Sequence, residues 1–293
     1  MTTALPDEVP SLQLRDGRRL AWQEAGDPAG RAVFAFHGLP GSREQRHPDE
    51  SIARSAGARM IHVDRPGFGL SDPAPQRRLR DWAGDVVQLA DYLRLDRFAV
   101  AGVSGGGPFA TACAALLPGR VSRLALVSSV GPPGSMHGQP RMHGVVRTAF
   151  ALALRVPWML APPMALAATL AVSQPERYVA LLARQMAARD RAILLQPAVR
   201  AMLARDVREA FRQGTNGFIR DLSLLANPWD FALGEIRAEC GIWHGGADRM
   251  IPPSASERLA GAIHGSRLCL LPNEGHFLIF DRWKQILAWV AEG

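Results

Sequence analysis

The sequence predicts an α/β protein in which a central, mostly parallel sheet carries helices on both faces and is interrupted by an inserted helical cap. Strand-like apolar runs and helical segments alternate up to about residue 128, and the next convincing strand begins only at residue 241. With 293 residues and 47% hydrophobic content, the chain is long enough for one large core and an insertion. We expect residues 1–130 and 231–293 to form the core and residues 131–230 to form the cap.

The first part of the predicted core opens with a hairpin. Strand patterns at residues 12–15 and 18–22 flank Asp16-Gly17, a strong signal for a tight hairpin turn. The continuous apolar run 32–36 is typical of a strand buried on both faces. The patterns that follow predict helix at 44–57, strand at 59–63, helix at 79–95, strand at 98–103, helix at 109–117 and strand at 124–128.

The predicted cap consists of helices separated by prolines. Its expected helices cover 142–156, 164–172, 178–189, 198–213 and 218–225. Residues 150–172 are strongly apolar, but Arg155 and several prolines divide them into pieces too short to cross about 30 Å of hydrocarbon, so we expect no membrane span. The core then resumes with strand 241–243, helix 254–263, strand 267–271 and helix 283–291.

Composition argues against several classes of function. The net charge is +7, but basic residues form no runs with interleaved aromatic residues, so nucleic-acid binding is not expected. Cys113, Cys240 and Cys269 lie in apolar segments and are expected to be reduced and buried. The sequence has no metal-ligand spacing of His or Cys residues, so no metal or cofactor is expected. The N-terminus lacks a secretory signal pattern, which favours a cytoplasmic protein.

The segment Gly102-Val103-Ser104-Gly105-Gly106 follows the apolar strand 98–103 and precedes an Ala-rich helix. A serine at such a sharp strand-to-helix turn is held above the edge of the sheet, and glycines on either side allow the close approach of the backbone. A plain glycine-rich turn is one alternative interpretation. A dinucleotide-binding loop is another, but the next strand ends in Ser128 and lacks the acidic residue that would hold a ribose.

Three reactive side chains follow predicted parallel strands and are expected to meet at one edge of the sheet. Ser104 follows strand 98–103, Asp248 follows strand 241–243, and His276 follows strand 267–271. Histidine can take the proton of a serine hydroxyl, and a carboxylate can fix the histidine tautomer. The alternative interpretations are that His276 is an ordinary surface histidine and that Asp248 is a turn residue. We expect Glu274 to be solvated, and we expect Asp64 and Arg65 to form a structural ion pair or turn.

With these motifs, the chain resembles the α/β-hydrolase family over essentially its whole length. The resemblance rests on the Ser104 elbow, His37-Gly38-Leu39-Pro40-Gly41, Asp64-Arg65-Pro66-Gly67-Phe68-Gly69-Leu70-Ser71, Gly245-Gly246-Ala247-Asp248 and Gly275-His276-Phe277. It implies that the backbone amides of Leu39 and Gly105 form an oxyanion hole. It also implies a substrate pocket between the core loops and the cap, for which the candidate lining residues are Phe68, Met142, Trp158 and Met159.

Two subclasses of the family fit the sequence poorly. Haloalkane dehalogenases and epoxide hydrolases need an aspartate nucleophile, and Ser104 stands in its place. Prolyl aminopeptidases need acidic cap residues to hold an ammonium group, whereas residues 131–230 contain twelve arginines, no lysine and only six acidic residues. The sequence therefore favours a large, apolar, neutral or anionic small-molecule substrate. A group of six cap methionines suits an adaptable apolar wall: Met136, Met142, Met159, Met164, Met186 and Met202.

These observations lead to one main hypothesis, a serine hydrolase that cleaves an ester, thioester or lactone through an acyl-enzyme on Ser104. An acyltransferase or cyclase with the same three residues is an alternative, because only the access of water separates the two reactions. A non-catalytic small-molecule receptor on the same fold is a third possibility, although a receptor has no need for all three residues. The acyl and leaving groups, the pathway and the oligomeric state do not follow from the sequence.

Overall fold

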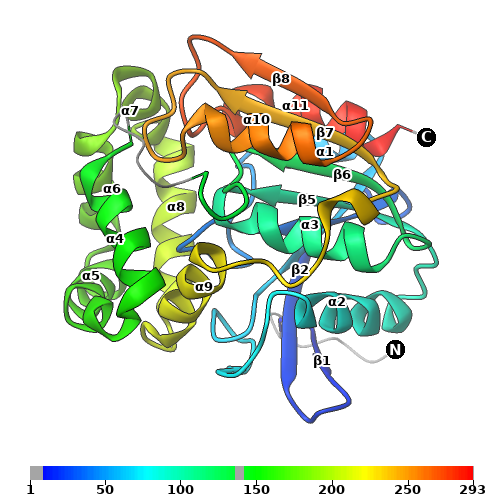
Figure 1. Ribbon diagram of the computed structural model, residues 1–293, viewed down its shortest axis with the longest axis horizontal. Helices are drawn as coiled ribbons and strands as arrows, with labels where there is room; N and C mark the ends of the chain where they lie inside the picture. The colour runs from blue at the N-terminus through cyan, green and yellow to red at the C-terminus, as the bar shows by residue number, and fades with distance from the viewer. Residues whose placement is uncertain (1–8, 136–141, 293) are drawn as a thin grey trace, which may run out of the picture.

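The computed structural model describes residues 9–135 and 142–292, and its centre is an eight-stranded sheet in the order β1-β2-β4-β3-β5-β6-β7-β8 (Figure 1). Pairing is antiparallel between β1 and β2 and between β2 and β4, and parallel from β4 to β8. The strands are β1 Ser11–Gln13, β2 Arg19–Gly26, β3 Arg31–Phe36, β4 Ala58–Val63, β5 Phe98–Val103, β6 Val121–Val127, β7 Glu239–Gly245 and β8 Arg267–Leu271.

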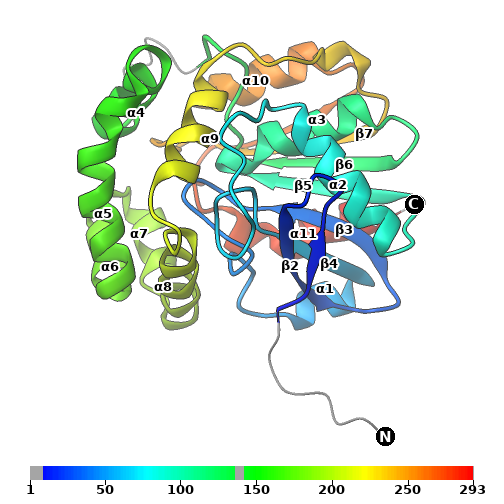
Figure 2. The same ribbon diagram turned by 90° about the horizontal axis from the view of Figure 1, so that it is seen from below.

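Helices cover both faces of this sheet (Figure 2). One face carries α2 (Asp81–Tyr92), α3 (Gly107–Leu116) and α10 (Pro253–Ala262), and the other carries α1 (Ser51–Ser55) and α11 (Ile279–Ala291). The two faces bury separate apolar clusters, with Phe34 and Val100 in one and Val33 and Ala101 in the other. This alternation of sides along β3 and β5 is what a doubly covered strand requires. The predicted α/β-hydrolase fold class is therefore confirmed.

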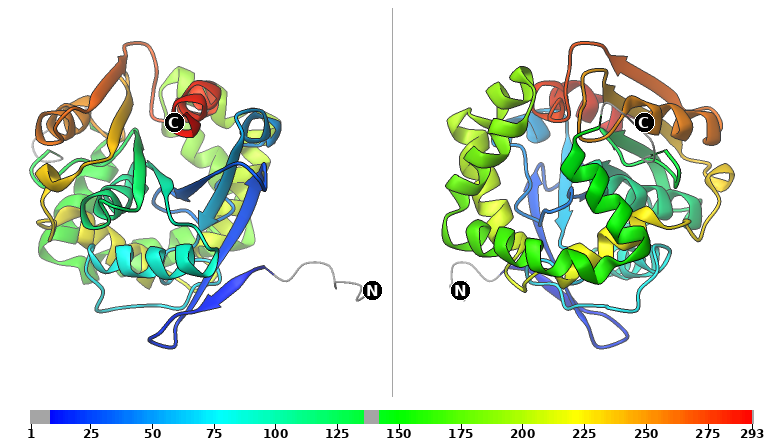
Figure 3. Two further views of the ribbon diagram at one scale, coloured as in Figure 1. Left: turned by 90° about the vertical axis from the view of Figure 1, so that its right-hand side faces the viewer. Right: turned by 60° about the vertical axis from the view of Figure 1, so that its left-hand side comes forward.

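Among the described residues, six α-helices lie between β6 and β7 in the chain and form a layer of their own, which we call the cap. They are α4 Gly144–Arg155, α5 Ala161–Ser173, α6 Pro175–Gln185, α7 Ala188–Leu194, α8 Pro197–Ala210 and α9 Asn216–Ala226. In Figure 3 (right) they form a curved layer in front of the strands. Within the described residues, no helix is both long and apolar enough to span a bilayer. The division of the chain at residues 131 and 230 remains a prediction.

Most predicted helices agree with the structure to within a few residues at each end, but two differ more. The helix expected over 44–57 is only α1, Ser51–Ser55, because the residues before it form a loop in which Gln45 donates to Asp206 of α8 and Asp49 accepts the N–H of Ser51. The helix expected over 178–189 ends at Gln185, and a separate helix, α7, begins at Ala188. Extended backbone at Met186 and at Ala187 separates the two helices and changes the chain direction.

Candidate active site

Ser104 lies on a tight turn between β5 and α3. Its φ is +52°, in the left-handed region that non-glycine residues rarely adopt, and the turn continues directly into α3. A Cβ atom on Gly102 would lie 2.6 Å from the carbonyl oxygen of Gly106, and one on Gly106 would overlap the carbonyl of Phe36. The glycines therefore allow the close packing of strand, turn and helix that presents Ser104 at the sheet edge.

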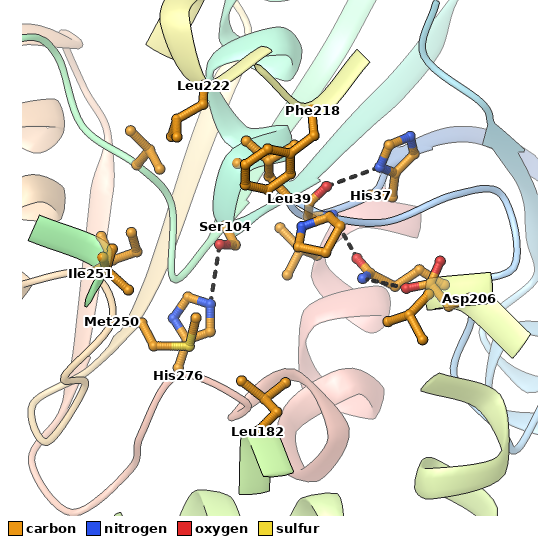
Figure 4. A pocket seen from close by; sticks show the side chains of 18 of the residues that line it. His37, Leu39, Ser104, Leu182, Asp206, Phe218, Leu222, Met250, Ile251 and His276 are labelled. Carbon is orange, nitrogen blue, oxygen red and sulfur yellow. Dashed lines mark hydrogen bonds between the residues drawn. The ribbon is translucent and has the colours of Figure 1, made fainter. Parts of the chain in front are cut away.

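The structure brings Ser104, His276 and Asp248 into one hydrogen-bonded row. His276 Nδ1 lies 2.7 Å from Asp248 Oδ2, and His276 Nε2 lies 3.1 Å from Ser104 Oγ (Figure 4 shows the second contact). A carboxylate only accepts hydrogen bonds, so Nδ1 carries the proton and Nε2 is left to accept the hydroxyl hydrogen of Ser104. This arrangement is suited to removing the proton of Ser104.

The surroundings of Asp248 stabilise its charge. Its Oδ1 accepts hydrogen bonds from the backbone N–H groups of Met250 and Ile251, at 2.8 and 3.0 Å. Burial opposes ionisation of Asp248, but the charge of His276 and hydrogen bonds from His276 and His244 hold its pKa below the usual value. Burial also favours the neutral ring of His276, yet the Asp248 carboxylate raises the pKa of that histidine. Asp248 is therefore a charged partner for a histidine that gains a proton.

The loop after β3 places Leu39 beside the Ser104 turn. A Cβ atom on Gly105 would lie 2.7 Å from Leu39 Cβ and 3.4 Å from the Leu39 backbone nitrogen. Buried His37 donates from Nδ1 to the carbonyl of Gly38 and accepts the Arg65 N–H on Nε2. Burial, together with the charge of Arg65, keeps the pKa of His37 well below its usual value. The neutral histidine thus acts as a structural element of this loop.

The cap reaches the same loop through Asp206 of α8. Gly38 N–H donates to Gln45 Oε1 at 2.6 Å, and Gln45 Nε2 donates to Asp206 Oδ2 at 3.0 Å. The other oxygen of Asp206 accepts the backbone N–H and the hydroxyl of Ser42, at 2.7 and 2.8 Å. Asp206 has no cationic partner among the described residues, and burial raises its pKa to about 7 despite these hydrogen bonds.

Asp64 and Arg65 do not pair with each other. Asp64 bonds Arg43, and Arg65 bonds Asp221 of α9 at 2.7 Å from its Nε. The guanidinium group of Arg65 also donates to the carbonyls of His37 and Gly38. Both residues have the predicted structural role, but each forms its ion pair with a different segment: Asp64 with the loop after β3 and Arg65 with α9.

A cavity of about 650 Å³, partly open to solvent, lies between Ser104 and the cap. Most of its lining side chains are apolar, and many come from the cap: Val146, Ala149, Phe150, Leu160, Met164, Leu182, Leu203, Val207, Phe211, Phe218, Leu222 and Leu225. Figure 4 shows Leu182, Phe218 and Leu222 arranged around Ser104. The polar side chains that the cap contributes to this lining are Thr148, Tyr178 and Asp206.

The four residues predicted to line the pocket do not line this cavity. Trp158 and Met159 are 72% and 46% exposed on the outside of the cap. Phe68 is buried behind the loop after β3, with its ring against His37. Met142 is buried too, yet outside the lining.

The prediction that the cap methionines together form a wall of the substrate pocket is also wrong. Met164 lines the cavity, whereas Met186, between α6 and α7, and Met202 of α8 are buried outside the lining, and Met136 lies outside the described residues. None of the cap arginines that the structure describes lines the cavity.

Glu274 is buried rather than solvated, because its carboxylate bonds Arg189 of α7 and Arg282 of α11. Asp206 and Asp190, whose carboxylate accepts the N–H of His276, are not among the site residues that the sequence predicts. A signal existed for Asp206, since it shares the spacing of Val199, Met202, Leu203 and Ala210, the buried face of α8. Cys113 and Cys240 are buried as expected, and Cys269 is partly exposed.

The chain belongs to the alpha/beta hydrolase fold family, which it matches over residues 31–282. A dihydrolipoyllysine-residue acetyltransferase component of the acetoin cleaving system of Pseudomonas putida is 29% identical, over 92% of this chain and 65% of that protein. A 2-hydroxy-6-oxononadienedioate/2-hydroxy-6-oxononatrienedioate hydrolase of Cupriavidus pinatubonensis is 27% identical, over 81% of this chain and 76% of that protein. The chain spans between 38% and 65% of the lengths of the acetyltransferase component and three further curated relatives.

Solved structures show the same fold. The enol-lactonase from Burkholderia xenovorans LB400 has a TM-score of 0.69 and 21% identity, over 96% of this chain and 98% of that chain. Hydrolases and esterases are among the similar proteins.

Proposed function

We propose that this protein is a serine hydrolase that cleaves an ester, thioester or lactone of an apolar small molecule. The observation that carries the proposal is the row Ser104–His276–Asp248, with contacts of 3.1 and 2.7 Å, at the wall of a largely apolar cavity. Nucleophile, base and orienting carboxylate are in mutual hydrogen-bond reach, which is the geometric requirement for this chemistry.

In the proposed reaction, Ser104 Oγ attacks the substrate carbonyl carbon while His276 Nε2 takes the hydroxyl proton. The carbonyl oxygen becomes negative, and the backbone N–H groups of Leu39 and Gly105 bind it. As the bond to the leaving oxygen or sulfur breaks, His276 returns the proton to that atom. A water molecule, deprotonated by His276, then attacks the acyl carbon and releases the acid and Ser104. Asp248 stabilises the charged ring in both halves of the reaction.

The cavity supports an apolar substrate without a free ammonium group. An ammonium ion would need an available carboxylate, and Asp206 is the acidic residue in the cavity lining. Both oxygens of Asp206 already accept hydrogen bonds from Ser42 and Gln45. The carboxylates of Asp190 and Asp221 are likewise occupied by core loops.

Acyl transfer is a second candidate, because one relative carries the name of an acetyltransferase component and the largely apolar cavity lining offers few partners for a water molecule near an acyl-enzyme. One assay distinguishes hydrolysis from acyl transfer. Purified protein is incubated with p-nitrophenyl esters of increasing chain length, with and without alcohols and thiols, and the products are identified by mass spectrometry. Free acid as the main product supports hydrolysis, whereas transesterified product supports transfer.

The same panel tests the substrate class. Esters with longer acyl chains are expected to have a higher kcat/KM than the acetate, and proline arylamide is expected to remain intact. Preference for acetate, or turnover of the arylamide, would contradict the proposed class.

A further inference from the structure

The loop that carries His276 is held by a carboxylate from the cap. Asp190 of α7 accepts the backbone N–H of His276 on Oδ2 and that of Phe277 on Oδ1, each at 3.0 Å. Its side chain is buried, and Gly275 packs so closely against it that a Cβ atom there would overlap the carboxylate. The contact therefore needs glycine at position 275 and an acceptor with two oxygens at position 190.

A second tie joins the same helix to the same loop. Arg189 donates from Nε to Glu274 at 2.5 Å and from one terminal nitrogen to Asp281 at 2.9 Å. Arg189 is half exposed, so this ion pair is weak in water. Of the two backbone N–H hydrogen bonds to Asp190, the one from His276 is buried and the one from Phe277 partly buried, which makes them the stronger constraint on the loop.

We propose that Asp190 is a positioning residue for His276, so that the cap forms part of the catalytic geometry as well as the wall of the substrate cavity. This inference rests on the proposed role of the Ser104–His276–Asp248 row. The two hydrogen bonds to Asp190 fix the peptide groups of His276 and Phe277 and therefore the position of the His276 Cα atom. That position determines whether Nε2 can reach Ser104 Oγ and Nδ1 can reach Asp248. An amide at position 190 could accept from one backbone N–H only and would present its own NH₂ group to the other.

Asp190 also contributes charge near the ring of His276. The groups that face this histidine are Asp248 from the loop after β7, Asp190 from α7 and the neutral hydroxyl of Ser104. Glu274, on the same loop as His276, is paired with Arg189 and Arg282. Burial lowers the pKa of His276, and the charges of Asp248 and then Asp190 raise it. Loss of the Asp190 charge therefore favours the neutral ring.

The test compares Asp190→Asn with a matched control, Glu176→Gln, which removes a carboxylate from an exposed cap ion pair. For the wild type and both variants, kcat and KM for p-nitrophenyl butyrate are measured from pH 5 to 9, together with the rate of Ser104 labelling by a fluorophosphonate. Asp190→Asn is expected to lower kcat by up to about 100-fold, with KM nearly unchanged and the acid limb of the pH profile moved to lower pH. The control should match the wild type.

A purely structural role for Asp190 would leave the acid limb where it is, so an unchanged kcat and an unchanged acid limb would overturn the inference. If Asp190→Asn does not fold, Asp190→Glu is used, since it keeps the charge and both acceptor oxygens but moves them. The expected result is then a lower kcat with an unmoved acid limb, and wild-type kcat would contradict it. Failure of the wild type itself to label at Ser104 would instead refute the proposed function.

Discussion

His276 Nε2 lies 3.1 Å from Ser104 Oγ although 172 positions separate the two residues in the chain. The contact needs the left-handed turn that presents Ser104 and the loop after β8 that presents His276. Asp248 completes the row from a third loop, at 2.7 Å from His276 Nδ1. Three loops at the carboxyl ends of parallel strands thus converge on one point, as expected for a sheet of this kind.

The pH dependence of ester hydrolysis should report His276. The reaction needs a neutral ring to accept the proton of Ser104. Burial opposes protonation of His276, but the Asp248 carboxylate raises its pKa above the ordinary value of a histidine. Activity should therefore rise with pH, with the acid limb at a higher pH than an unperturbed histidine would give. Asp248→Asn should lower kcat by about 10⁴-fold and move the remaining acid limb to lower pH. An acid limb that does not move in the variant would contradict this assignment.

A larger side chain in the cavity should shorten the preferred acyl chain. Ala149 of α4 lines the cavity, and Ala149→Trp would fill part of its space. The expected result is a lower kcat/KM for long-chain p-nitrophenyl esters, with little change for the acetate. Leu166→Trp is the control, because Leu166 is 75% exposed on the outer face of α5. Equal chain-length profiles for the two variants would show that this part of the cavity does not hold the acyl chain.

Asp206 should make stability depend on pH. Its pKa is raised by burial from 3.8 to about 7, so the folded state binds more protons than the unfolded state between these values. The contribution of Asp206 to the free energy of unfolding should therefore fall as pH rises from about 4 to 7. Asp206→Asn does not titrate, and the free-energy difference between wild type and variant should change by about 4 kcal/mol across this range, at 1.36 kcal/mol per pH unit. Urea unfolding at several pH values measures it, and a constant difference would contradict the prediction.

Removal of the Asp221 carboxylate should destabilise the protein strongly. Asp221 pairs with Arg65 and Arg77, and all three side chains are buried. Asp221→Ala would leave two guanidinium groups without their partner, which typically costs about 3–5 kcal/mol. Asp91→Ala, which breaks the exposed pair with Arg120, should change stability by less than about 1 kcal/mol. The free energies of unfolding in urea compare the two variants, and similar values would contradict the prediction.

The core and the reactive row could be predicted because their signals are local. Apolar runs such as residues 32–36 and glycines beside Ser104 act on neighbouring backbone, and parallel strands then bring the loops that follow them to one edge. The contacts of Asp190 and Asp206 could not be predicted in the same way. They join residues 86 and 164 positions apart through the orientation of cap helices on the core.

The prediction of the pocket-lining residues was wrong for a related reason. Helix α5 is apolar around its whole circumference, so its sequence periodicity does not indicate which face points inward, and Leu166 on it is largely exposed. Trp158 and Met159 lie on the turn that leads into α5 and point away from the cavity lining. Apolar character alone therefore overestimated their contact with a substrate.

Covalent labelling of Ser104 is the decisive test of its role as the nucleophile. Wild-type protein is treated with a fluorophosphonate, digested and analysed by mass spectrometry, beside Ser104→Ala and a control, Ser173→Ala, which changes a serine exposed on the cap. The proposed function predicts one modified site, Ser104, and loss of both labelling and ester turnover in Ser104→Ala by about 10⁴- to 10⁶-fold in rate, with an unchanged circular dichroism spectrum. Labelling or turnover that persists in Ser104→Ala would contradict it.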